Sequence, residues 1–258
     1  MTDVHSSALV EDSVQLGKNV TVGPNSVLQG DVRIGDDTTL KANVHIRDKV
    51  VIGSDNTIEI GTVIGTDPQD WSYEEARDTG IEIGDENIIR EYVTINKATA
   101  DGEMTRIGNE NMIMAYCHIA HDCVIGSNVD MANGVNLAGH VTIGNNVVVS
   151  GHTGFHQFIR VGDYAMVGGL SRIVKDVVPY SRVSGNPLEV YGLNSVGLKR
   201  NGFDKETRHV LKRAFKMLFR SDNNTTQALE LIKDEFPDND SVSRLADFIE
   251  NSERGIHK

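Results

Sequence analysis

"SVQLGKNVTVGPNSVLQGDVRIGDDTTLKANVHI", residues 13–46, carries an aliphatic residue at every sixth position. These residues are Leu16, Val22, Leu28, Ile34, Leu40 and Ile46. An amphipathic helix would repeat about every 3.6 residues and a half-buried strand every second residue, so neither produces this spacing. A β-solenoid does, because each six-residue repeat supplies one short strand and one turn. Three such repeats close a roughly triangular coil of eighteen residues.

The same register runs from Val10 to Ile173 and pauses twice, near 66–82 and near 97–106. About twenty-five repeats make about eight coils, which would stack about 4.8 Å apart. Gly, Asn and Asp between the aliphatic residues suit tight, often left-handed corners. The pauses are expected to be loops that leave the prism without breaking its stacking. The sequence therefore predicts a parallel β-helix over residues 1–190, although the spacing does not fix its handedness.

The periodicity changes after "VVPYSRVSGNP", residues 177–187. Leu211, Phe215 and Leu218 then share one face of a helical pattern, with basic residues on another face. The stretches 225–236 and 240–252 are typical of two further amphipathic helices, with Thr or Asp available at their starts. We expect a small α-helical C-terminal domain over residues 191–258, which caps the solenoid.

The formal net charge of −12 disfavours general binding to nucleic acids or anionic membranes, which requires a positive surface. No apolar run is long enough to span a bilayer, the start lacks a signal-peptide pattern, and there are only two cysteines. These features predict a cytoplasmic protein. We interpret Cys117 and Cys123 as small buried hydrophobic residues, with an acyl-accepting thiol as a weaker alternative.

Basic residues concentrate in one segment of this acidic chain. Residues 197–220 hold eight Lys or Arg against two acidic residues, a net charge of +6, so the other residues sum to −18. This segment favours a specific anionic partner, with a solvated helix face as the simpler alternative.

Four of the nine histidines fall on one column of the predicted prism. Ile119, Leu137 and Phe155 are eighteen residues apart and should stack in successive coils. The histidines close to them are His118, His121, His140 and His156. His152 belongs to the neighbouring column. Because neighbours of inward residues point outward along a strand, we expect these histidines on an outer face.

The residues alone leave three interpretations of this column open. The histidines could be ordinary surface residues, or three of them could hold a divalent metal. They could also provide a general base, since Asp122 adjoins His121 and a carboxylate on one ring nitrogen fixes the tautomer that accepts a proton. A flat solenoid face cannot enclose a small molecule by itself. We therefore expect a cyclic oligomer with the histidine column in the cleft between subunits.

Several short motifs together resemble one family, the UDP-N-acetylglucosamine O-acyltransferases of lipid A biosynthesis. They are "QD" at 69–70, "HIAHDC" at 118–123, "LAGH" at 137–140, "FHQF" at 155–158, "VGG" at 167–169 and "GLKR" at 197–200, followed by "GF". The resemblance covers essentially the whole chain. It implies a left-handed β-helix, a homotrimer with active sites between subunits, and the first step of lipid A biosynthesis.

The reaction that the resemblance implies moves an (R)-3-hydroxyacyl group from acyl carrier protein to the 3-position of the UDP-sugar. No metal or separate cofactor is expected, because the donor brings its own phosphopantetheine arm. By motif, His121 would be the general base, Asp122 would orient it, and the Gly139 N–H would stabilise the oxyanion. The substrate-binding residues would be Gln69, Asp70, His118, His140, His156, Gln157, Gly169, Asn194 and Arg200.

Two of these features concern the donor. Gly169 matches the position that limits acyl-chain length in the family, and its lack of a side chain predicts an open groove and a longer chain. The basic segment 197–220 would attract the acidic acyl carrier protein.

The chain departs from the family pattern at Ser72, Asn96, Val196 and Asn201. These departures leave open an acceptor with a 3-amino group, and hence an N-acyltransferase that uses acyl carrier protein, in this or the later lipid A step. Two other classes also remain as alternatives: a metal-dependent hexapeptide protein and a trimeric scaffold without enzymatic activity.

Overall fold

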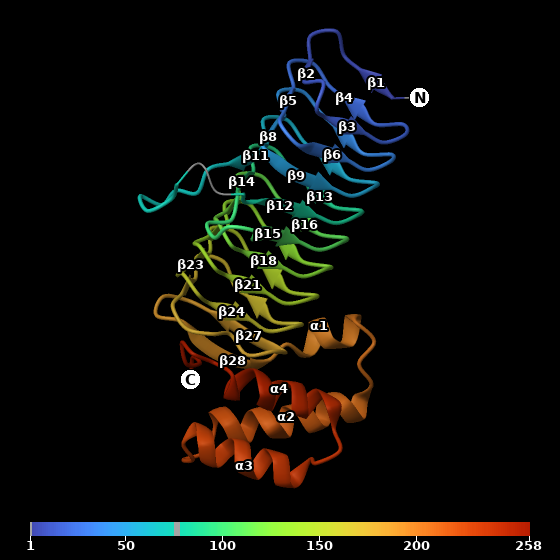
Figure 1. Cartoon of the computed structure of the whole chain (residues 1–258). Helices are drawn as coiled ribbons and strands as arrows, with labels where there is room; N and C mark the ends of the chain where they lie inside the picture. The colour runs from blue at the N-terminus through green and yellow to red at the C-terminus, as the bar shows by residue number, and fades with distance from the viewer. Residues whose placement is uncertain (1, 75–77) are drawn as a thin grey trace.

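The computed structural model describes residues 2–74 and 78–258, and Figure 1 shows them as a tall prism of stacked coils above a group of helices. Three sheets form the walls of the prism, and consecutive strands visit them in turn. The first sheet contains β1 (Asp3–Val4), β4 (Thr21–Val22), β7 (Thr39–Leu40), β10 (Thr57–Ile58), β13 (Ile88–Ile89), β16 (Met112–Ile113), β19 (Asp130–Met131), β22 (Val148–Val149), β25 (Met166–Val167), β27 (Ser181–Ser184) and β28 (Glu189–Leu193).

The second sheet contains β2 (Leu9–Val10), β5 (Val27–Gln29), β8 (His45–Arg47), β11 (Val63–Thr66), β14 (Thr94–Asn96), β17 (His118–Ile119), β20 (Asn136–Leu137), β23 (Gly154–Phe155) and β26 (Arg172–Ile173). The third sheet contains β3 (Gln15–Leu16), β6 (Val32–Ile34), β9 (Lys49–Ile52), β12 (Gly80–Ile83), β15 (Met104–Ile107), β18 (Val124–Ile125), β21 (Thr142–Ile143) and β24 (Arg160–Val161). The strands pair in parallel, except for the antiparallel hairpin β27–β28.

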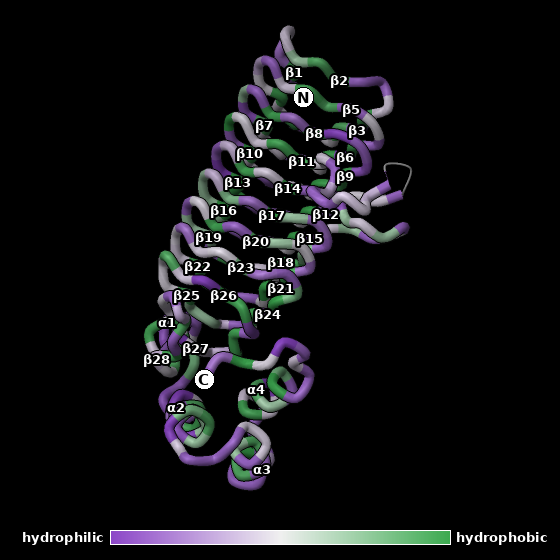
Figure 2. The backbone as a smooth tube through the Cα atoms, turned by 90° about the vertical axis from the view of Figure 1, so that its left-hand side faces the viewer, coloured by the Kyte–Doolittle hydropathy of each residue, from purple (hydrophilic) through white to green (hydrophobic). Residues whose placement is uncertain are grey.

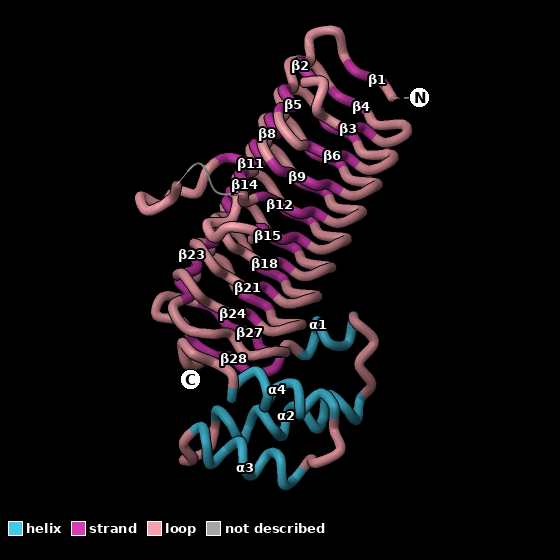
Figure 3. The backbone as a smooth tube through the Cα atoms, viewed as in Figure 1, coloured by secondary structure: helices cyan, strands magenta, loops and turns pink. Residues whose placement is uncertain are grey.

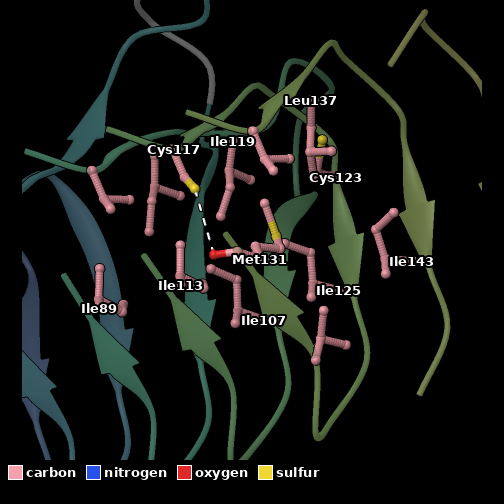
Figure 4. Close-up of a cluster of buried hydrophobic side chains, with 14 of the residues drawn as sticks. Ile89, Ile107, Ile113, Cys117, Ile119, Cys123, Ile125, Met131, Leu137 and Ile143 are labelled. Atoms are coloured by element: carbon pink, nitrogen blue, oxygen red, sulfur yellow. Dashed lines mark hydrogen bonds between the residues drawn. The ribbon is translucent and has the colours of Figure 1, made fainter. Parts of the chain in front are cut away.

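The eighteen-residue spacing is the pairing register of the second sheet. Ile119 pairs with Leu137, and Leu137 pairs with Phe155. Ile119 and Leu137 point into the prism with the other register residues labelled in Figure 4, where Cys117 and Cys123 lie among them. Ile119 and Leu137 are fully buried, and burial of such a side chain contributes on the order of 2 kcal/mol. The predicted parallel β-helix is confirmed.

Corners of the coils adopt left-handed backbone angles at many residues other than glycine, including bulky ones. Tyr92 and Tyr116 have φ of 57° and 62°, and their rings stack with centroids 5.3 Å apart. A left-handed residue with a side chain costs roughly 1–2 kcal/mol. Most corner N–H groups donate to the coil before them, as from Tyr116 to the Glu91 carbonyl at 3.0 Å, which helps to offset that strain.

Loops interrupt the prism at residues 67–74 and 78–79, here called the first loop, and at residues 97–103, the second loop. Strands β12 and β15 take up the last residues of the pauses in the register. Gly80 pairs with both Lys49 and Met104, so the four-residue strands lie side by side across three coils. The first loop stands out from the wall between β11 and β12 in Figure 1.

The helices lie at the C-terminal end of the prism, as Figure 3 shows. They are α1 (Ser195–Arg200), α2 (Lys205–Phe219), α3 (Thr225–Glu235) and α4 (Asp240–Glu250). Asp204 and Asn224 cap the starts of α2 and α3 through their side chains. Leu211 and Leu245 belong to a second apolar core between the helices. Hydrophilic and hydrophobic segments alternate along the coils in Figure 2. No described helix combines the length and apolarity needed to cross a bilayer.

Candidate active site

A cavity of about 550 Å³ lies on the second sheet, next to the histidine column. Six of the residues singled out in the sequence line it: Gln69, His118, His121, Gly139, His156 and Gln157. They come from β17, from the corners that follow β17, β20 and β23, and from the first loop. Stacking of coils therefore brings together side chains that are up to 88 residues apart in the chain.

His121 and Asp122 form the most closely paired group at this cavity. Nδ1 of His121 lies 2.8 Å from Oδ2 of Asp122. Because an ionised carboxylate can only accept a hydrogen bond, this contact favours a proton on Nδ1 and leaves Nε2 able to accept one. We refer to these two residues as the dyad.

The His121 side chain is only 6% exposed, so the expectation of an outer-face position is wrong for this residue. Its ring lies against Gly139 of the next coil, and a Cβ atom at position 139 would overlap it. The side chain turns along the wall at a corner and does not stand out from a strand. It still borders the cavity, so one edge remains available to a substrate.

Three further groups hold the Asp122 carboxylate. The Thr99 N–H donates to Oδ1 at 3.0 Å, and the Thr99 hydroxyl donates to Oδ2 at 2.7 Å. Nε2 of His140 lies 3.4 Å from Oδ2. Burial raises the pKa of Asp122, but the hydrogen bonds from His121 and Thr99 outweigh that effect and lower the pKa to about 2. The carboxylate is therefore ionised at neutral pH.

The two other histidines near the dyad differ in their surroundings. His118 is half-buried, and its Nδ1 lies 2.8 Å from the Thr94 hydroxyl. Burial, and to a smaller extent His121, lower the pKa of His118, which favours its neutral form. The His140 ring meets the His121 ring edge-on with centroids 5.3 Å apart and stacks on Phe158 at 4.5 Å. His140 thus packs against the ring of His121 and lies near the Asp122 carboxylate, but it does not line the cavity.

The remaining polar residues at the column are more exposed. Nδ1 of His156 lies 3.0 Å from the guanidinium of Arg254, near the C-terminus. Asp70 accepts hydrogen bonds from the N–H and hydroxyl of Ser72, which lower its pKa, and the charges of His121 and His140 act on it in the same direction. Asp70 is therefore ionised at neutral pH.

Like Asp70, Asp122 and His140, three further predicted residues do not line this cavity in the single chain: Gly169, Asn194 and Arg200. Gly169 is exposed at the corner after β25. Asn194 caps α1 by accepting from the Gly197 N–H, and it donates to the Tyr164 carbonyl at 2.9 Å. Arg200 is the exposed last residue of α1.

The cysteines lie inside the prism. Burial raises the pKa of Cys117 to about 11 and that of Cys123 to about 12, so both are neutral thiols at pH 7. This supports the interpretation as small hydrophobic residues and disfavours a thiolate nucleophile.

The residues around the dyad are also a candidate metal site. Ligand atoms of His121, Asp122 and His140 lie within 4.8 Å of one another. The Asp122 oxygens, however, already accept from Thr99 and His121. The hydrogen bonds account for the cluster, and the arrangement matches an oriented base more closely than a ligand set.

Sequence reasoning missed several residues at this site. The cavity is also lined by Asn136, Gly154 and Arg172. Asn136 pairs with His118, Gly154 pairs with Asn136, and Arg172 pairs with Gly154, so the four residues form one row across the coils. Counting in steps of eighteen would have found them. Thr99 lies in the second loop, outside the sixfold register, and no pattern in the sequence indicated its contact with Asp122.

Comparison with known proteins places this geometry in a family. The family model described as UDP-N-acetylglucosamine O-acyltransferase, domain 2, matches residues 176–257, and the bacterial transferase hexapeptide model matches 13–48 and 104–139. Acyl-[acyl-carrier-protein]–UDP-N-acetylglucosamine O-acyltransferases from Alkalilimnicola ehrlichii and Thiobacillus denitrificans are 48% and 47% identical, and each alignment covers 99% of both chains.

Solved structures agree with these relatives. The UDP-N-acetylglucosamine O-acyltransferase of Moraxella catarrhalis superposes with a TM-score of 0.96 at 41% identity, covering 99% of both chains. The enzyme of Bacteroides fragilis gives a TM-score of 0.96 at 38% identity, covering 98% of this chain and 99% of that one. The chain, a left-handed parallel β-helix with a helical C-terminal end, belongs to the acyl-[acyl-carrier-protein]–UDP-N-acetylglucosamine O-acyltransferase family.

Proposed function

We propose that this chain transfers an (R)-3-hydroxyacyl group from acyl carrier protein to the 3-hydroxyl of UDP-N-acetylglucosamine, the first step of lipid A biosynthesis. The names of the full-length relatives support the reaction. The observation that carries the mechanism is the dyad at the edge of the cavity, with 2.8 Å between Nδ1 of His121 and Oδ2 of Asp122.

In this mechanism His121 is the general base. Its Nε2 takes the proton from the sugar hydroxyl while the hydroxyl oxygen attacks the thioester carbonyl. Asp122 keeps Nδ1 protonated and stabilises the imidazolium that forms. When the tetrahedral intermediate collapses, the C–S bond breaks, the imidazolium returns the proton to the departing thiolate, and ester and free thiol result.

Gly139 would supply the donor to the oxyanion. Among the described residues, no group accepts a hydrogen bond from its N–H, and the residue borders the cavity. A fixed N–H aimed at the developing charge stabilises the transition state more than the ground state. The donor arm itself brings the reactive thioester, so we propose no metal or other cofactor.

The sugar would lie against His118, His156, Gln157 and the loop residues Gln69 and Asp70. Asn194, Arg200 and Gly169 lie outside the cavity of one chain. We propose that a neighbouring subunit of a homotrimer completes the nucleotide and acyl sites at this flat wall. The trimer would work in the cytoplasm, where acyl carrier protein is available.

A second cavity, of about 410 Å³, offers a surface for the donor protein. Tyr191 and Phe215 form part of its apolar floor, and Lys212, Lys216 and Arg220 surround it. The three cations are exposed on α2 and its end. Acyl carrier proteins are acidic, so this surface would attract one by charge complementarity. We propose residues 191–258 as the domain that recognises it.

The direct test offers the purified chain UDP-N-acetylglucosamine and its 3-amino analogue, each with a series of (R)-3-hydroxyacyl-acyl carrier proteins. Mass spectrometry of the products gives the acceptor atom and the chain length. We expect an ester at the 3-oxygen with the unmodified sugar. Turnover with the amine alone would establish the N-acyltransferase alternative instead.

The same sample separates the metal-dependent alternative. Elemental analysis would give less than one equivalent of metal per chain, and turnover would survive a chelator. A stoichiometric metal whose removal abolishes activity would contradict the proposed proton transfer by a free imidazole.

A further inference from the structure

Residues 96–99 comprise the last residue of β14 and the start of the second loop, and they contact two parts of the site that are otherwise separate. On one side is the Asp122 carboxylate, and on the other is the start of the first loop, which brings Gln69 to the cavity. We propose that segment 96–99 is a positioning element, in which Thr99 holds the dyad and Lys97 holds the first loop. This inference rests on the proposed function of the dyad.

Thr99 grips the Asp122 carboxylate at both oxygens. Its N–H donates to Oδ1 at 3.0 Å and its hydroxyl to Oδ2 at 2.7 Å. The Asp122 N–H in turn donates to the Thr105 hydroxyl at 2.9 Å. Backbone and side chain of Asp122 are thus held separately. Because His121 is oriented by the same Oδ2 atom, a rotation of the carboxylate would turn the base away from its substrate.

Lys97 forms the second set of contacts, with two carboxylates, one of which belongs to the first loop. Its side chain is only 6% exposed, and Nζ lies 3.0 Å from Oδ2 of Asp48 and 2.9 Å from Oδ1 of Asp67. Burial disfavours the ammonium charge, but the two carboxylates more than offset this and raise the pKa of Lys97 above its ordinary value. Among the described residues, Oδ1 of Asp67 has no aligned hydrogen-bond donor, so the ammonium compensates its charge as an ion pair.

Neighbouring contacts make the segment rigid. The Asn96 amide donates to the Thr66 hydroxyl at 2.8 Å and to the Asp67 carbonyl at 3.1 Å. The Lys97 N–H donates to the Thr66 carbonyl at 3.0 Å, and Ala98 is fully buried. The Asn96 NH2 group is therefore occupied by Thr66, the last residue of β11, and by Asp67, the first residue of the loop, so this departure from the family pattern acts on loop position.

The contacts of Thr99 with Asp122 and of Lys97 with Asp48 and Asp67 predict different kinetic effects. Removing the Thr99 hydroxyl should disturb the base, and so lower kcat with little change in KM for the sugar nucleotide. Removing the Lys97 charge should loosen the loop that carries Gln69, and so raise that KM with little change in kcat.

The first experiment compares Thr99→Val, Thr99→Ser, Asp122→Ala and the double variant Thr99→Val/Asp122→Ala with the wild type. We expect kcat to fall about 10- to 100-fold in Thr99→Val and to stay near wild type in Thr99→Ser. In the Asp122→Ala background, Thr99→Val should have no further effect. Thr57→Val, on the first sheet, is the matched control and should leave kcat unchanged.

The second experiment measures Lys97→Met against Lys18→Met, an exposed lysine in the first coils. We expect a roughly tenfold rise in KM for UDP-N-acetylglucosamine in Lys97→Met alone. Three results would overturn the role of Thr99: a wild-type kcat in Thr99→Val, an equal loss of kcat in Thr99→Ser, or an additive loss of kcat in the double variant. The role of Lys97 would be overturned if Lys97→Met changed kcat alone and left KM for UDP-N-acetylglucosamine unchanged.

A measurement independent of turnover separates this inference from the proposed function. The Thr99 hydroxyl favours the ionised form of Asp122, so Thr99→Val should be less stable than the wild type at pH 7. That difference should shrink as the pH falls from about 4 to about 2. A constant difference would overturn the Thr99 contact. If the stability difference between Thr99→Val and the wild type shrinks in acid as expected, but the wild type shows no turnover, only the proposed function would be contradicted.

Discussion

The ring of His121 occupies the space that a side chain at position 139 would need. Gly139 lies on the next coil, and it is required here for close approach, because its backbone does not adopt the left-handed angles that favour glycine. The histidine of one coil and the glycine of the next therefore form one packed unit at the edge of the cavity.

Gly139→Ala should displace the imidazole while it leaves the backbone N–H in place. We expect kcat to fall about 10- to 100-fold because the base moves out of line with its substrate. Steady-state kinetics would check this with Gly151→Ala as control, because position 151 lies outside the cavity and a Cβ there approaches only the Asn133 carbonyl oxygen, at 3.1 Å. Equal kinetics in both variants would contradict the packing argument.

His121→Ala should lower kcat roughly 10²- to 10⁴-fold, the usual effect of losing a general base. The fold, and with it the proposed trimer, should persist, because the mutated ring lies outside the aliphatic core. His152→Ala, in the neighbouring column, is the control and should keep normal turnover. Full activity in His121→Ala would remove the mechanism, and a protein with no measurable change at all would favour the scaffold alternative.

Ionisation of Asp122 should contribute to stability. Its pKa falls from 3.8 to about 2 on folding, so the contribution is complete above pH 3.8 and is lost as the pH falls toward 2. We expect Asp122→Asn to lower the free energy of unfolding by about 2 kcal/mol at pH 7 and by much less near pH 2. Urea denaturation of both proteins at pH 7, 4, 3 and 2 would measure this, and a stability difference that widens in acid would have the wrong sign.

Gly169→Met should shift the donor preference to shorter acyl chains if position 169 faces the acyl groove of the assembled protein. A Cβ there would approach the Gly151 carbonyl oxygen at 3.2 Å, which a small shift can accommodate. Competition between donors of different length gives the readout. Leu170→Met, at the adjacent exposed position, should keep the wild-type preference, and unchanged selectivity in both would refute the groove assignment.

Lys212→Glu combined with Lys216→Glu should weaken the encounter with acyl carrier protein. We expect KM for the acyl donor to rise severalfold and to lose much of its dependence on salt, while KM for the sugar nucleotide stays the same. Lys18→Glu combined with Lys41→Glu makes the same charge change at two exposed positions in the first coils, far from the helices. A comparable effect in that control would point to overall charge instead of a local surface.

Much of the site could be predicted because a solenoid converts sequence spacing into distance. Ile119 and Leu137 are eighteen residues apart and pair directly, so His118 and His121 had to lie beside the following coil. The same count leads to Asn136 and Gly154, which line the cavity. The pairing of His121 with its neighbour Asp122 was also predictable, because adjacent residues at a corner can turn toward each other.

Other parts of the site depend on contacts that have no period. Thr99 reaches Asp122 from a loop outside the register, and Lys97 reaches Asp48 and Asp67 from the same segment. The burial of His121 depends on how closely the Gly139 backbone packs against it. Counting residues cannot locate such contacts.

The amino-acid sequence by itself determined the winding of this protein and the wall on which its histidines lie, because a sixfold aliphatic repeat can be buried only by stacking coils in register. The tertiary structure decided which histidine is buried and oriented, and what holds the first loop in place. Those features arise where irregular loops pack against the coils, and packing of that kind is set by the whole three-dimensional surroundings of each side chain.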